Sequence, residues 1–350
     1  MRKVNWNAAG RSILALALGA VCGLIANWAG LPLPWMLGPM IGVTIAALIG
    51  APLLGPERLR PYVIPVIGVL LGSGFTPEAF MAVSKWAVTL MLLVPFLMMA
   101  ALASYTFYRK VGRFDPITAF FCAMPGGLND MMIMGAQAGG DETRIALAHA
   151  SRVLLVVLFV VLFFGFFMGV TTGDKASNWV ELSALAPLDW AVLGACAVLG
   201  VILGKWIGLP AAPIFGPMIL SGAAHLTGLV TVAPPSVIVI TAQIVVGTVI
   251  GCRFMGRAPR DVGYEILLGL GASLSMITVA VGFAFLTAYL TGTDLSQAFL
   301  AYSPGGLTEM SLLALAMGQD VTYVSLSHII RITLVIAAAR PALRLVRRWL

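Results

Sequence analysis

The chain has 350 residues, of which 60% are hydrophobic and only 10% carry a charge. Its mean hydropathy is +1.00, whereas about 25% of the residues of a soluble globular domain are charged. The composition therefore excludes a soluble globular protein. It predicts a polytopic membrane protein, because apolar runs of roughly 20 residues, long enough to span a bilayer, recur along the chain.

The net charge of +7 does not indicate a nucleic-acid partner, because the basic residues form short clusters between apolar runs. These clusters lie at 109–113, 253–260 and 340–348, which is the pattern of positively charged cytoplasmic loops. The four cysteines form no CxxC pair, and we expect neither a metal site nor a cofactor.

Taken in chain order, the first apolar run ends at Trp28 and is interpreted as a membrane-spanning helix rather than a cleaved signal. Four further runs and one interrupted segment complete residues 1–170, the first predicted membrane repeat. A polar connection at 171–187 is too short to fold alone. A second set of the same kind fills residues 188–350, the second repeat.

The two halves are copies of one another. The stretch WAGLPLPWMLGPM at 28–40 aligns without a gap with WIGLPAAPIFGPM at 206–218. Further along, PGGLNDM at 125–131 matches PGGLTEM at 304–310, so that Asp130 corresponds to Glu309. In the same register His149 matches His328, and Arg152 matches Arg331.

These paired motifs resemble those of the AbrB-type bacterial membrane family, and the resemblance covers nearly the whole chain. It implies a membrane protein with an internal duplication. Members of the family carry labels that refer to an ammonia monooxygenase or to a transcriptional regulator, so the resemblance implies little about the chemistry.

The charge pattern favours an inverted arrangement of the two repeats. Neither arm of a Pro-Gly-Gly segment is long enough to cross about 30 Å of hydrocarbon. If each segment re-enters as a hairpin, each repeat has five transmembrane helices, and only Lys85 and Lys175 lie outside. If each segment crosses instead, the repeats are parallel and the basic cluster at 253–260 lies outside. We therefore predict an all-α fold of two inverted repeats, with both termini cytoplasmic in the bacterial inner membrane.

The Pro-Gly-Gly segments are the predicted substrate site. They break a helix inside the membrane, and the freed backbone groups must be buried in protein or line a wet cavity. The second arm is expected to begin near Leu128, and its N–H groups favour negative charge. The predicted substrate-binding residues are Pro125, Gly126, Gly127, Asn129, Arg152, Pro304, Gly305, Gly306, Thr308 and Arg331. A structural alternative is a tight corner with Asn129 and Thr308 as helix N-caps.

Four titratable residues are the candidates for ion or proton coupling. Asp130 and Glu309 are carboxylates within apolar segments, which either bind the coupling ion or cap the second arm of their hairpin. His149 and His328 each lie three residues before a buried arginine, on the same helix face. We expect Glu309 or Asp130 to be the partner of these arginines, either in a static ion pair or at a site for an anionic substrate.

The sequence therefore predicts a secondary transporter that moves a small, anionic solute, coupled to protons or sodium, by alternating access at a midplane site. The expected partners are this solute, the lipid bilayer and, as one option, a second copy of the chain. The alternative is a membrane sensor that influences gene expression without transport. An enzyme is not expected, because a copper monooxygenase would need a cluster of histidine ligands.

Overall fold

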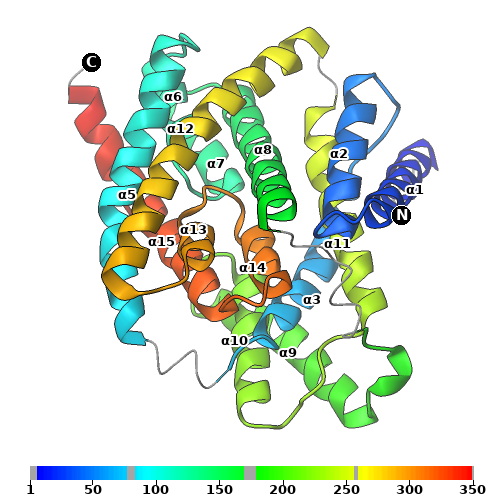
Figure 1. Cartoon of the computed structure of the whole chain (residues 1–350). Helices are drawn as coiled ribbons and strands as arrows, with labels where there is room; N and C mark the ends of the chain where they lie inside the picture. The colour runs from blue at the N-terminus through cyan, green and yellow to red at the C-terminus, as the bar shows by residue number, and fades with distance from the viewer. Residues whose placement is uncertain (1–5, 77–82, 169–178, 256–258, 349–350) are drawn as a thin grey trace. The chain divides into compact units, whose positions relative to one another are not determined.

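The computed structural model describes residues 6–76, 83–168, 179–255 and 259–348, and the regular elements in these ranges are helices (Figure 1). The first repeat contains α1 (Trp6–Trp28), α2 (Pro34–Leu48), α3 (Arg60–Gly72), α5 (Val83–Lys110), α6 (Pro116–Ala123), α7 (Leu128–Ala138) and α8 (Glu142–Met168). The second repeat contains α9 (Pro187–Trp206), α10 (Ala212–Leu226), α11 (Ser236–Gly251), α12 (Pro259–Thr291), α13 (Leu295–Tyr302), α14 (Leu307–Ala316) and α15 (Val321–Arg348).

Seven of the described helices are long and apolar enough to cross a membrane, by length and composition. They are α1, α5, α8, α9, α11 (extended through the following short turn to Phe254), α12 and α15. Three more, α2, α3 and α10, have 15, 13 and 15 residues, which corresponds to about 20–22 Å of helix. The sequence predicted ten transmembrane helices; seven described helices reach that length, and these three are shorter than the expected spans.

The short helices α2 and α10 begin in the same way, which explains their length. Leu33 and Ala211 precede them in the left-handed region, with φ of 49° and 47°. A proline stands at the start of each helix, where its missing N–H leaves no hydrogen bond unmade. Each helix therefore begins only after this left-handed residue, and the part of the apolar run before it is not helical.

The helices form two compact units, and each unit takes helices from both repeats. The first unit contains α1, α2 and α3 together with α9, α10 and α11. The second contains α5, α6, α7, α12, α13 and α14, with most of α8 and α15. The interrupted helices of both repeats thus belong to one unit, the second, and the site is described within it.

In the first unit, corresponding helix pairs pack through glycine. A Cβ atom on Gly38 of α2 would overlap the backbone carbonyl of Cys22 on α1. A Cβ atom on Gly216 of α10 would overlap the carbonyl of Gly200 on α9. Small residues allow such close approach of helix backbones in membranes, and the repeated Gly-Pro-Met motif supplies them in both copies.

In this unit, a glycine of each repeat also packs against a helix of the other repeat. Gly68 of α3 lies against the Ile214 carbonyl of α10, and Gly247 of α11 lies against the Met36 carbonyl of α2. The two contacts join corresponding residues of the two copies, because Gly68 matches Gly247 and Met36 matches Ile214 in the sequence register. Each repeat therefore provides the packing surface that the other needs.

Candidate functional site

Both Pro-Gly-Gly segments interrupt a helix, as predicted from the sequence. In the first repeat, α6 ends at Ala123 and α7 begins at Leu128; in the second, α13 ends at Tyr302 and α14 begins at Leu307. The four arms have 8, 11, 8 and 10 residues, or about 12–17 Å each. The residue before each proline is extended, with ψ of 124° at Met124 and 131° at Ser303, because proline disfavours a helical predecessor.

The first arm of each segment begins at an aspartate cap. Asp115 accepts hydrogen bonds from the backbone N–H groups of Ile117 and Thr118. Asp294 accepts the equivalent bonds from Ser296 and Gln297. Burial raises the pKa of Asp115, but hydrogen bonds from Thr118 and Ile117 outweigh this effect, so its pKa lies below the ordinary value.

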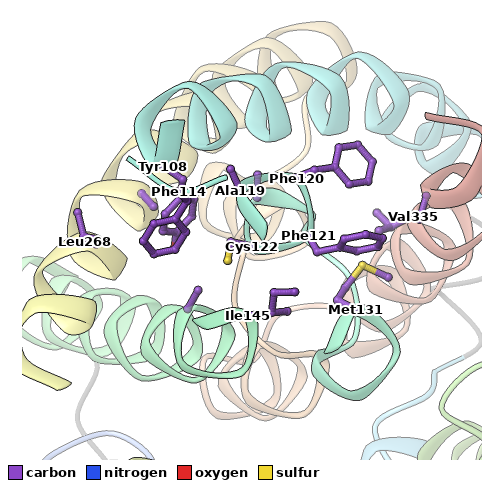
Figure 2. Close-up of a cluster of buried hydrophobic side chains, with 14 residues drawn as sticks. Tyr108, Phe114, Ala119, Phe120, Phe121, Cys122, Met131, Ile145, Leu268 and Val335 are labelled. Atoms are coloured by element: carbon purple, nitrogen blue, oxygen red, sulfur yellow. The ribbon is translucent and has the colours of Figure 1, made fainter. Parts of the chain in front are cut away.

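Apolar side chains enclose the first arm of the first repeat. Figure 2 shows Phe120, Phe121 and Cys122 of α6 among residues of α5, α7, α8, α12 and α15. Phe121 and Cys122 are 1% and 2% exposed. Carbonyl groups freed at the end of this arm therefore lie in an apolar environment and need hydrogen-bond donors from the protein.

His149 and Arg152 of α8 supply these donors. A ring nitrogen of His149, Nε2, lies 2.9 Å from the Phe121 carbonyl oxygen. Arg152 donates from Nη1 to the Met124 carbonyl at 3.0 Å, and from Nη2 to the Gly126 carbonyl at 3.4 Å. The histidine and arginine side chains thus satisfy the last carbonyl groups of α6 and of the break.

The second repeat contains the same arrangement. His328 Nε2 lies 2.9 Å from the Leu300 carbonyl oxygen. Arg331 donates from Nη1 to the Ser303 carbonyl, and from Nη2 to the Gly305 carbonyl at 2.8 Å. A cation at the C-terminal end of a helix also interacts favourably with the helix dipole. Each His-Arg pair therefore acts as the C-terminal cap of an interrupted helix.

Each histidine also contacts its own arginine. Arg152 Nη2 lies 2.8 Å from His149 Nδ1, and Arg331 Nη2 lies 3.1 Å from His328 Nδ1. A guanidinium group only donates hydrogen bonds, so Nδ1 must be the acceptor in both rings. The ring proton is then on Nε2, which donates it to the helix carbonyl. A proton reaches Nδ1 only if the arginine moves away.

We expected Glu309 or Asp130 to be the partner of the buried arginines, and this pairing stays a prediction. The hydrogen bonds found for Arg152 and Arg331 go to main-chain carbonyl oxygens and to histidine. These partners carry no net charge. The break itself provides them, because it releases carbonyl groups that a continuous helix would have bonded internally.

The two guanidinium groups keep donor capacity for another group. Arg152 and Arg331 are 6% and 3% exposed. The Nε atom of each is buried and has no hydrogen-bond partner among the described residues. A buried cation with neutral partners and an unused N–H is a favourable position for an anion.

The two carboxylates lie at the start of the second arms. A Cβ atom on Gly127 would come within 2.6 Å of Asp130 Oδ2, and one on Gly306 would overlap Glu309 Oε2. Each carboxylate therefore folds back over the glycine that precedes its helix, where the helix dipole favours negative charge. Asp130 is exposed, whereas Glu309 is only 5% exposed.

The structure places most of the residues predicted for the site in one compact unit. The breaks, the His-Arg pairs and the two carboxylates lie within the second unit. The N-cap of α7 is Gly127 rather than Asn129, whose side chain lies outside the described part. Thr308 follows Leu307, the first residue of α14, and so is not its N-cap either. The sequence analysis missed the carbonyl groups of Phe121, Met124, Leu300 and Ser303, which no side-chain pattern reveals.

The fold is all-helical in its described part, consistent with a polytopic membrane protein, and has two interrupted helices, each capped by a buried His-Arg pair. The family described as "Transition state regulatory protein AbrB" matches residues 35–347. The chain therefore belongs to the AbrB family.

Two relatives are similar over most of their length. "Uncharacterized protein YhjN" of Bacillus subtilis (strain 168) is 26% identical over 354 aligned positions, which cover 94% of this chain and 91% of the relative. "Putative regulator AbrB" of Escherichia coli (strain K12) is 24% identical over 308 positions, which cover 86% of each chain.

Proposed function

We propose that the protein is a secondary transporter of a small, anionic solute, coupled to protons or sodium, and not an enzyme. The observation that carries this proposal is the pair of buried arginines, whose Nε groups have no partner among the described residues. Removing a guanidinium group from water without a counter-charge is costly, and an anion between the two half-sites would supply that charge. The half-sites are the His-Arg pairs with the breaks that they cap.

The two carboxylates provide a reason for coupling. Deprotonated Asp130 and Glu309 oppose the approach of an anion to Arg152 and Arg331. A bound proton or sodium ion removes their charge and leaves the arginine charge to be balanced by the substrate. Cation and anion would then bind together, which is the thermodynamic requirement for symport.

We further propose that the repeats are inverted and that the two breaks meet near the midplane of the inner membrane, with both termini cytoplasmic. The exchange of glycine contacts between the copies supports a twofold relation, and the basic clusters support inversion. Labelling from outside tests this arrangement in a chain without the four cysteines. Cysteines that replace Lys110 and Arg257 should both resist a membrane-impermeant reagent. Labelling of position 257 but not of position 110 would mean parallel repeats.

Anion binding can be measured on the purified protein. We expect oxyanions such as sulfate, acetate and succinate to raise the melting temperature, and chloride to raise it less, because a guanidinium group binds paired oxygens best. Arg152→Gln and Arg331→Gln should remove the effect. Arg344→Gln, an exposed arginine of α15, is the control and should retain it. If both site variants respond to the anions as the parent does, the arginines are only helix caps.

A membrane sensor is the second candidate, because the similar Escherichia coli protein is named as a regulator. The same buried site would then bind the anion without moving it. Purified protein in liposomes separates the two functions. Uptake of an anion that also raises the melting temperature supports transport, whereas binding without uptake supports sensing.

A further inference from the structure

The second break is held by a tyrosine that the first break lacks. Tyr302 is the last residue of α13, directly before the break, and the corresponding residue of the first repeat is Ala123. Its side chain is 0% exposed. The ring packs against Phe96 of α5 and Phe283 of α12, with ring centroids 5.1 Å and 6.0 Å away.

The hydroxyl group of Tyr302 joins three helices. It donates its proton to the Thr89 carbonyl of α5 at 3.0 Å. It also lies 2.9 Å from the Thr287 hydroxyl of α12; since the tyrosine proton is already used, Thr287 is the donor in this bond. The hydroxyl oxygen of Thr89 in turn lies 2.7 Å from the hydroxyl oxygen of Tyr323 on α15. Thr89, Thr287 and Tyr323 are all buried.

The second arm of this hairpin is also held by hydroxyl groups. Ser325 of α15 donates to Ser311 of α14 at 2.8 Å, and both are 0% exposed. The corresponding residues of the first repeat are Ala146 and Met132, which cannot form such a bond. Both arms of the second hairpin thus form buried hydrogen bonds through Tyr302 and Ser311. The corresponding residues of the first hairpin, Ala123 and Met132, have no hydroxyl group and cannot form these bonds.

The contacts of the arginines with the glycine carbonyl groups differ in the same direction, whereas the arginine–histidine contact is shorter in the first repeat. Arg331 Nη2 lies 2.8 Å from the Gly305 carbonyl, whereas Arg152 Nη2 lies 3.4 Å from the Gly126 carbonyl. Ser303 and Gly305 are buried, but Met124 and Gly126 are only half-buried. The break of the first repeat is therefore held more weakly at the arginine itself.

We propose that Tyr302 is a positioning residue that fixes the second half-site, and that the first hairpin is the one that moves when the anion binds. This inference rests on the proposed function for the identity of the ligand. In the first half-site, release of the weakly held Gly126 carbonyl frees one N–H of Arg152 Nη2, while the other N–H still donates to His149. Nη2 and the unused Nε form one edge of the guanidinium group, which matches two oxygens of a carboxylate, sulfate or phosphate group. The oxyanion takes the place of the Gly126 carbonyl.

Hydrogen-deuterium exchange of the ligand-free, full-length protein tests the difference between the hairpins. Residues 126–131 and 305–310 have nearly the same sequence, GGLNDM and GGLTEM, so their intrinsic exchange rates are close. We expect faster exchange in 126–131. Tyr302→Phe keeps the packed ring and removes the hydroxyl. It should raise exchange in 305–310 about five- to tenfold, the effect of one lost buried hydrogen bond, and leave 126–131 unchanged.

The control is Ser221→Ala, which removes a buried hydrogen bond to the Val69 carbonyl in the first unit and should change neither segment. Equal exchange of the two segments in the parent would overturn the inference. So would a Tyr302→Phe variant that changes both segments alike, or neither. These outcomes require no added anion, so they are independent of the binding screen that tests the proposed function.

Discussion

Arg331→Lys should lower the melting temperature of the protein and abolish anion binding, although it preserves the charge. The arginine donates to two carbonyl groups and to His328 from two separate nitrogens. A lysine ammonium group is a single point with a flexible stem and does not reach all three acceptors. Each buried acceptor left without a donor costs about 1–3 kcal/mol, so we expect the free energy of unfolding to fall by about 2–4 kcal/mol.

Arg344→Lys is the control for this measurement, because Arg344 lies on the same helix and is exposed. It should leave the melting temperature within a degree or so of the parent value, since exposed substitutions are usually near neutral. If Arg331→Lys has the melting temperature of the parent and still binds anions, the several hydrogen-bond donors of the guanidinium group are not required at the break.

Glu309→Gln should abolish accumulation of the anion driven by a proton or sodium gradient. Glutamine keeps a side-chain oxygen near the start of α14 but cannot carry the charge that the coupling cation neutralises. Asp130→Asn should have a smaller effect, because Asp130 is exposed, whereas Glu309 is 5% exposed. The measurement is uptake of labelled anion into liposomes with an imposed gradient.

Exchange of labelled for unlabelled anion across the same liposomes is the control, since exchange requires no net movement of the cation. We expect Glu309→Gln to retain exchange and lose accumulation. If both variants concentrate the anion as well as the parent does, the two carboxylates only stabilise the second arms and the coupling assignment is wrong.

The interrupted helices were predictable because proline and glycine act through local backbone chemistry. Pro125, Gly126 and Gly127 disfavour helix whatever surrounds them, and the in-register copy at 304–306 repeats the signal. The contact between His149 and Arg152 was predictable for a similar reason, because residues three apart share a helix face. These features depend on a few neighbouring residues.

The partners of the arginines were not predictable in the same way. The sequence suggested a carboxylate or an anionic substrate as the partner of Arg152 and Arg331, but the acceptors found include backbone carbonyl groups, which every residue carries. Which carbonyl groups lack a bond becomes known only when the end of α6 is known to within one residue. The role of Tyr302 was missed because its partners, Thr89 and Thr287, lie on helices distant in sequence.

The reciprocal glycine contacts of the first unit bear on the origin of the gene. Gly68 packs on the second copy and Gly247 packs on the first, so these two glycines find their packing surface only in the other copy. A polypeptide with one copy alone would have had to find that surface on another identical molecule. A homodimer of half-length chains would offer the same reciprocal contacts, and fusion of two such genes would allow Tyr302, Glu309 and their counterparts to diverge.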